Sequence, residues 1–241
     1  MKHEQQVTEF SRRLQDSARD NLASLVVYGS VAAEEFHSGF SDVNLLCVLR
    51  RISEPLLRDL SPAVIWWTKQ GHPAPLIFCS EELSRSARVF PIEMLDIKEN
   101  HRVLVGDDPF VHLEIPMDLH RVQLEHELRT RLLHLRQQYA AIAADRKKID
   151  QLLLRSISAI STLFRHALIT LAGTAPASKA DVMRELGQRV SFDAAPFQKI
   201  LAIREAKSGV GKLPLGKNES YATFTAYLDA MDRVVKKITG L

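Results

Sequence analysis

The fold is decided by LVVYGS at residues 25–30 and by DVNLLCVL at residues 42–49, which follow each other with eleven residues between them. Both segments are short and apolar, and their Val and Tyr residues favour β-strands. Gly29 ends the first strand, and Ser30 is placed to cap a short helix over residues 31–36. We therefore expect two neighbouring strands with a polar connection.

Periodic segments surround this pair of strands. Hydrophobic spacing predicts helices over residues 4–22, 54–70 and 81–88, a strand over 75–80, and a turn over 103–109. Residues 91–97 fit either a strand or a helical turn. After Pro116 the pattern becomes wholly helical, with long helices over 118–144 and 147–172 and shorter ones near 178–189, 193–206 and 219–237. We expect an α+β chain, in which a small mixed β-sheet domain (residues 1–117) precedes an all-α helical bundle (residues 118–241).

Composition divides the chain in the same way. Its 241 residues are 46% hydrophobic and 25% charged, which excludes a disordered or collagen-like protein. Residues 1–120 carry a net charge of −6 and residues 121–241 one of +9. Cys47 and Cys79 are too few for a disulfide framework, and we expect buried thiols in a reducing cytoplasm. The sequence contains no uninterrupted run of about 18 apolar residues, so we expect no membrane span.

The spacing of Gly29-Ser30 and Asp42-Val43-Asn44 resembles the signature of the nucleotidyltransferase fold of the DNA polymerase β type. That signature is a strand ending in Gly-Ser, a connection of similar length, and two carboxylates one residue apart on the next strand. The resemblance covers mainly residues 22–50. It implies transfer of a nucleoside monophosphate from a nucleoside triphosphate to a hydroxyl acceptor, with Mg²⁺.

The resemblance also implies roles for individual residues. Gly29 and Ser30 would hold phosphate, because glycine lets the backbone approach closely and the amides at a helix start bind phosphate oxygens. Asp42 would be the first metal ligand. Alternate residues of a strand share a face, so the second ligand would be residue 44. Two such ligands hold a pair of Mg²⁺ ions that stabilise the attacking and leaving oxygens.

The sequence departs from this pattern at two places. Asn44 stands where a second carboxylate is expected, and its amide oxygen can bind Mg²⁺ but brings no negative charge. The family's third carboxylate, which acts as general base or metal ligand, is missing from the expected strand over residues 75–80. The acids that follow it are Glu81, Glu82, Glu93 and Asp96. We favour Glu93 or Asp96 as the catalytic acid, since an acid inside an apolar run is the more unusual.

The helical half resembles the C-terminal domains of aminoglycoside nucleotidyltransferases and the HEPN-type helical partners of minimal nucleotidyltransferases. The resemblance implies acceptor binding or homodimer contacts. Aminoglycosides are polycations that meet acidic pockets, so a basic half argues against such an acceptor. The positive charge of this half favours contact with phosphate or nucleic acid. It is also explained if the basic half packs against the acidic half across a domain interface.

Two main hypotheses follow from these residues. The first is an active nucleotidyltransferase in which Asp42, with help from Asn44, holds Mg²⁺. The second is a weakened relative that binds nucleotide or acts as a toxin–antitoxin-like or nucleic-acid-binding partner. A nucleic-acid-binding module that uses the basic half predicts affinity that falls steeply with salt.

Overall fold

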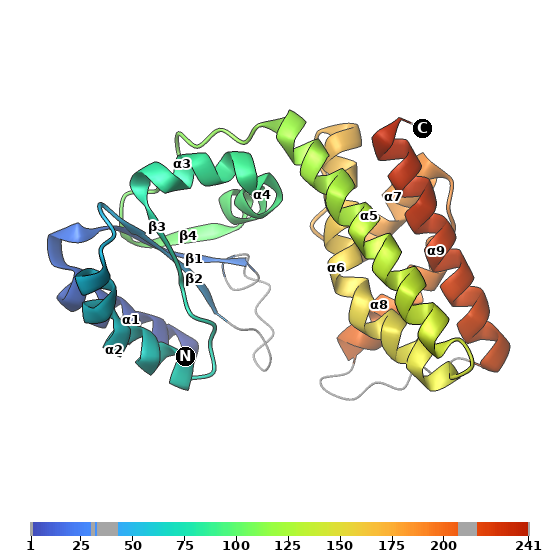
Figure 1. Ribbon diagram of the computed structural model, residues 1–241, viewed down its shortest axis with the longest axis horizontal. Helices are drawn as coiled ribbons and strands as arrows, with labels where there is room; N and C mark the ends of the chain where they lie inside the picture. Colours follow the sequence, from blue (N-terminus) through green and yellow to red (C-terminus); the bar gives the residue numbers. More distant parts are fainter. Residues whose placement is uncertain (1, 30–31, 33–42, 207–215, 241) are drawn as a thin grey trace. The chain divides into compact units, whose positions relative to one another are not determined.

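The computed structural model describes residues 2–29, 32, 43–206 and 216–240, which form two compact units, Met1–His120 and Arg121–Leu241 (Figure 1). The helices and strands of the first unit are α1 (Lys2–Ala18), the 3₁₀ helix η1 (Arg19–Asn21), β1 (Leu22–Tyr28), β2 (Asn44–Leu49), α2 (Glu54–Lys69), β3 (Leu76–Cys79), α3 (Ser80–Val89), α4 (Pro91–Glu99) and β4 (His101–Gly106). The remaining helices are α5 (Met117–Ile142), α6 (Arg146–Ala172), α7 (Lys179–Val190), α8 (Ala195–Ala206) and α9 (Lys217–Thr239).

The four described strands form one mixed sheet in the order β3-β2-β1-β4. The central strand β1 pairs antiparallel with both β2 and β4, and β2 pairs in parallel with β3. In this register Tyr28, the last residue of β1, lies opposite Asn44 on one side and His101 on the other. The sheet therefore places the end of β1 between the starts of β2 and β4.

Alternating side chains give the sheet two apolar faces, as the two-residue period of a strand requires. One face carries Leu25, Val27, Leu45 and Cys47 and packs with Phe10, Leu14 and Trp67 of α1 and α2. The opposite face carries Val26, Leu46 and Val48 and packs with Leu83, Met94 and Ile97 of α3 and α4. The first unit thus has three layers, with helices on both sides of the sheet (Figure 1).

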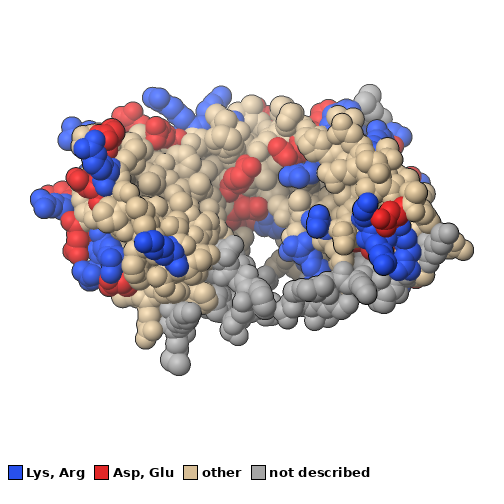
Figure 2. All heavy atoms as spheres, turned by 60° about the horizontal axis from the view of Figure 1, so that its bottom comes forward, with Lys and Arg blue, Asp and Glu red and all other residues tan. Residues whose placement is uncertain are grey.

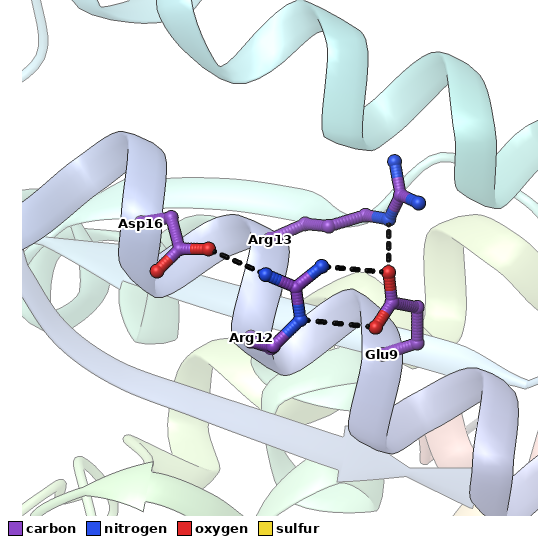
Figure 3. Close-up of polar contacts among 4 residues, drawn as sticks. All are labelled: Glu9, Arg12, Arg13 and Asp16. Carbon is purple, nitrogen blue, oxygen red and sulfur yellow. Dashed lines mark hydrogen bonds and ion pairs between the residues drawn. The ribbon is translucent and has the colours of Figure 1, made fainter.

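Helix α1 places its apolar side on the sheet and a charged cluster on its outer side. Arg12 binds Glu9 through two nitrogens at 3.0 and 2.9 Å and Asp16 at 2.8 Å, and Arg13 binds Glu9 at 2.7 Å (Figure 3). The guanidinium of Arg13 also lies over the ring of Trp66 in α2, 4.7 Å from its centroid. Such a cation–π contact joins the two helices at their edge.

Two sequence predictions for this unit need correction, and one open alternative is settled. The expected turn over residues 103–109 is wrong, because the segment from His101 to Gly106 pairs with β1 as strand β4. Residues 91–97 form a helix, α4, which has Pro91 in its first turn, where the missing proline N–H costs nothing. The helix expected over residues 4–22 ends at Ala18, and Leu22 already belongs to β1.

The second unit is organised around α6. This helix begins at the N-cap Asp145, whose carboxylate accepts the N–H groups of Lys147 and Lys148, and it ends at the left-handed Gly173. Its side chains Ile157 and Phe164 are fully buried among the neighbouring helices. Among the described helices, α6 has the length and composition of a membrane span, but 61% of its apolar window is buried inside the unit, as in a core helix.

Candidate functional site

The turn after β1 is fixed by hydrogen bonds on both sides of Gly29. Its N–H donates to the carbonyl oxygen of Asn100 at 2.9 Å, and its carbonyl oxygen accepts the N–H of Ala32 at 2.9 Å. The backbone of Gly29 has φ +80°, a conformation that costs an L-residue about 1–2 kcal/mol. The conformation of the turn therefore favours glycine. A ligand that approaches the backbone closely would favour glycine at the same position.

Asn44 lies directly beside this turn. It is the first residue of β2, is half-buried, and pairs with Tyr28 across the sheet. A Cβ atom added to Gly29 would stand 3.6 Å from Nδ2 of Asn44, which is ordinary van der Waals contact. The structure thus brings together the two described residues of the motif, one from each strand.

The phenol of Tyr28 shares this edge of the sheet. Its side chain packs against the core that contains Val26 and Leu46, on the face that carries alternate residues of β1 and β2. Burial raises the pKa of Tyr28 above its ordinary value of 10.0. The hydroxyl therefore stays neutral at physiological pH and can donate a hydrogen bond.

The start of β4 is anchored by His101. Its Nδ1 lies 2.9 Å from the carbonyl oxygen of Lys98 and its Nε2 lies 3.2 Å from Oδ1 of Asp108. These contacts hold the segment that carries Asn100, the acceptor for Gly29. Sequence reasoning missed this support, because the pairing of β4 with β1 joins residues far apart in the chain.

The start of β2 is held on its other side by His72. Strand β3 pairs with β2 only from Leu46 onward, so no strand backbone is paired with Val43 there. The buried imidazole takes this place: Nδ1 accepts the N–H of Val43 at 3.4 Å, and Nε2 donates to Oε1 of Gln6 at 3.2 Å. No local sequence signal marked His72, which lies in the loop between α2 and β3.

Of the other predicted site residues, two are not described by the structure and two lie on helix α4. Ser30 and Asp42 lie outside the described residues. Glu93 and Asp96 lie one turn apart on helix α4 rather than on a strand, and both make polar contacts. The carbonyl of Asp96 accepts the N–H of Asn100 at 3.1 Å, so α4 ends directly at the residue that supports Gly29.

Comparison with known proteins bears on the fold alone. No protein-family model and no curated protein matches this chain. A solved structure of spectinomycin adenyltransferase AAD(9) from Enterococcus faecialis, with ATP and spectinomycin, matches at 14% identity with a TM-score of 0.56. The match covers 95% of this chain and 98% of that one.

This chain has the nucleotidyltransferase fold. The expected α+β class, with a helical region after the mixed sheet, is confirmed. The two described residues of the predicted motif lie at neighbouring strand ends, and their roles stay predictions. Gly29 follows β1, and Asn44 is the first residue of β2.

The donors around this edge do not by themselves make a magnesium site. Among the residues that the structure describes, no group of three or more His, Cys, Asp or Glu side chains could hold a metal ion. Asn44 offers one neutral amide oxygen, whereas Mg²⁺ prefers carboxylates and phosphate oxygens. Asn44 is thus the one predicted metal ligand among the described residues, and Asp42 lies outside them.

Proposed function

We propose that this chain binds a nucleoside triphosphate at the end of β1 and transfers its nucleoside monophosphate to a hydroxyl acceptor. The observation that carries the proposal is the Gly29 turn, held at φ +80° with the Asn44 amide beside it in a nucleotidyltransferase fold. The structural relative AAD(9) was solved with ATP and is named an adenyltransferase, which supports the same reaction class.

In the proposed reaction an acceptor oxygen attacks the α-phosphorus. A new P–O bond forms, the bond between the α-phosphorus and the bridging oxygen breaks, and pyrophosphate leaves with its electron pair. The acceptor hydroxyl loses its proton to a carboxylate, for which Glu93 and Asp96 are the proposed bases, while Asp42 is proposed as a metal ligand. Because the N–H of Gly29 donates to Asn100, we propose that Gly29 lets the backbone approach phosphate closely, and that Ser30 holds phosphate oxygens through its hydroxyl.

The proposed site lacks one of the two carboxylates that would hold Mg²⁺ to neutralise the charge of the triphosphate. A bound Mg²⁺ would supply neutralisation of the triphosphate, and Asp42 and Asn44 are the residues proposed to touch it. Removing one anionic ligand weakens the attraction for a divalent cation. We therefore expect weaker binding of Mg²⁺ than at a site with two carboxylates.

A second candidate function is nucleotide binding without transfer. Two observations favour it: the neutral Asn44 and the absence of an acidic side chain from the described strand β3 (Leu76–Cys79). A protein of this kind would bind the triphosphate and release it unchanged. Its role would then lie in its helical unit, as a toxin–antitoxin-like or nucleic-acid-binding partner or as a homodimer.

The acceptor is proposed to differ from a polycationic aminoglycoside. The second unit, residues 121–241, carries a net charge of +9, which repels a polycation. A neutral or anionic hydroxyl compound fits this charge better.

Pyrophosphate release separates the two candidate functions. Purified protein is incubated with each of the four nucleoside triphosphates, Mg²⁺ and sets of neutral, cationic and phosphorylated hydroxyl compounds. Transfer predicts acceptor-dependent pyrophosphate that Asp42→Ala abolishes. Nucleotide binding without pyrophosphate release from any set favours the second candidate, and the lack of both contradicts the proposal.

A further inference from the structure

A hollow of about 200 Å³ lies between α5 and α6, entirely within the second unit. Arg131, His134 and Gln138 line it from α5, and Arg155, Ser156 and Ala159 line it from α6. Its other described lining residues are leucines and an isoleucine, so the described lining contains no carboxylate. The hollow is therefore basic and polar at its rim and apolar at its base.

The helical period explains how these side chains meet. Arg131, His134 and Gln138 are three and four residues apart and so share one face of α5. Ser156 and Ala159 are three residues apart on α6, and their small side chains leave the space open. The hydroxyl of Ser156 lies 3.0 Å from that of the buried Tyr227, which holds this side of the hollow in place.

The two arginines of the hollow differ from other arginines of this unit. Neither Arg131 nor Arg155 forms an ion pair or hydrogen bond with another described residue, and both are exposed. By contrast, several other arginines are paired with a carboxylate: Arg129 with Glu125, Arg136 with Asp232, Arg184 with Asp181, Arg189 with Glu185 and Arg233 with Asp229. The positive charge at the hollow is thus not neutralised by its described neighbours.

Lys and Arg side chains predominate on the visible face of the second unit, whereas acidic and basic side chains are interspersed on the first (Figure 2). The unpaired arginines therefore belong to a unit whose net charge already attracts anions.

We propose that this hollow binds a phosphate group, carried by a nucleotide or by a nucleic acid backbone. Guanidinium groups recognise phosphate through two parallel N–H donors. Arg131 and Arg155 can each donate in this way from opposite walls, and His134 and Gln138 add donors at the rim. The proposal goes beyond the proposed function, because it concerns a separate site in the helical unit.

Full-length protein is titrated at constant ionic strength with two probes, inorganic pyrophosphate and a labelled 12-nucleotide single-stranded RNA. The test variants are R131Q/R155Q, which removes the two unpaired guanidiniums, and Ala159→Leu, which fills the hollow. The matched control is R129Q/R189Q, since it removes the same charge from exposed arginines that already have partners. Asp42→Ala reports on phosphate bound at the proposed nucleotide site, and circular dichroism checks that each variant folds.

We expect R131Q/R155Q to weaken binding at least tenfold, while R129Q/R189Q stays within about twofold of the wild type, a difference of about 1 kcal/mol or more between test and control. Loss of RNA binding identifies a nucleic acid backbone as the source of the phosphate. Loss of pyrophosphate binding alone identifies a nucleotide or free phosphate. Equal losses in test and control variants, loss only in Asp42→Ala, or no binding of either probe would overturn the proposal.

Discussion

The backbone N–H of Gly29 donates a 2.9 Å hydrogen bond to the carbonyl oxygen of Asn100. This bond ties the turn after β1 to the junction of α4 and β4, far away in the sequence. It explains how a short motif acquires a rigid backbone.

Replacing Gly29 by alanine should strain the turn without a steric clash. The added Cβ meets only Nδ2 of Asn44 at 3.6 Å, so the cost comes from φ +80° and is about 1–2 kcal/mol. Urea denaturation measures it. Gly71→Ala is the matched control, because Gly71 has φ +93° and open space around it. Both variants should lose similar stability, and only Gly29→Ala should lose nucleotide binding. Equal binding by the two variants would show that the turn does not touch the ligand.

Restoring a carboxylate at position 44 should strengthen metal-dependent nucleotide binding. Asn44→Asp adds a negative charge beside the Gly29 turn, and an anionic oxygen binds Mg²⁺ better than an amide does. We expect the affinity for ATP to rise severalfold in Mg²⁺ and to fall in EDTA, where the new charge repels phosphate. Calorimetric titration measures both, with Asn44→Ala as the uncharged control. Unchanged affinity in both buffers would remove residue 44 from the site.

The charged cluster on α1 should stabilise the fold in a pH-dependent way. Hydrogen bonds from Arg12 and then Arg13 lower the pKa of Glu9 from 4.5 to about 2. A lowered folded-state pKa stabilises the fold above the unfolded value, and this contribution is lost as the pH falls from about 4.5 through about 2. The Tm difference between wild type and Glu9→Gln should therefore be small at pH 7, because the cluster is exposed, and should shrink below about pH 4.5 and reach zero only below about pH 2. A Tm difference that grows on acidification would contradict this sign.

The two cysteines should react with alkylating reagents at different rates. Cys47 is fully buried in β2, and burial raises the pKa of its thiol to about 12. Cys79, at the end of β3, is partly exposed. Because the thiolate is the nucleophile, iodoacetamide should label Cys79 in the folded protein and Cys47 only after unfolding. Peptide mass spectrometry measures both sites, and early labelling of Cys47 would mean that β2 opens readily.

The sequence predicted elements whose signal is local and regular. The long helices show the 3.6-residue period over many residues, and stop signals such as Gly173 mark their ends. Strand β4 was missed because its apolar run, Val103 to Val105, is short and is followed by Gly106 and Asp107. Only pairing with β1, which sequence cannot display, makes it a strand.

Of the candidate site, only the part encoded in the local motif could be predicted from the sequence. The closeness of Gly29 to Asn44 follows from the pairing of β1 with β2, while the roles proposed for both residues stay predictions. The supports from Asn100 and His72 were not predictable, since each depends on a contact between distant loops. Glu93 and Asp96 were chosen for being acids in an apolar run, and that run is a helix. Their proposed catalytic role stays a prediction.

Binding of ATP with Mg²⁺ tests the central claim most directly. Thermal melts of the wild type and Asp42→Ala are compared with and without ATP and Mg²⁺, using Asp59→Ala, an exposed acid on α2, as the charge-matched control. The proposed nucleotide site predicts a higher Tm for the wild type and for Asp59→Ala, and no shift for Asp42→Ala. No shift in the wild type with any nucleoside triphosphate, or an equal shift in all three proteins, would contradict the account.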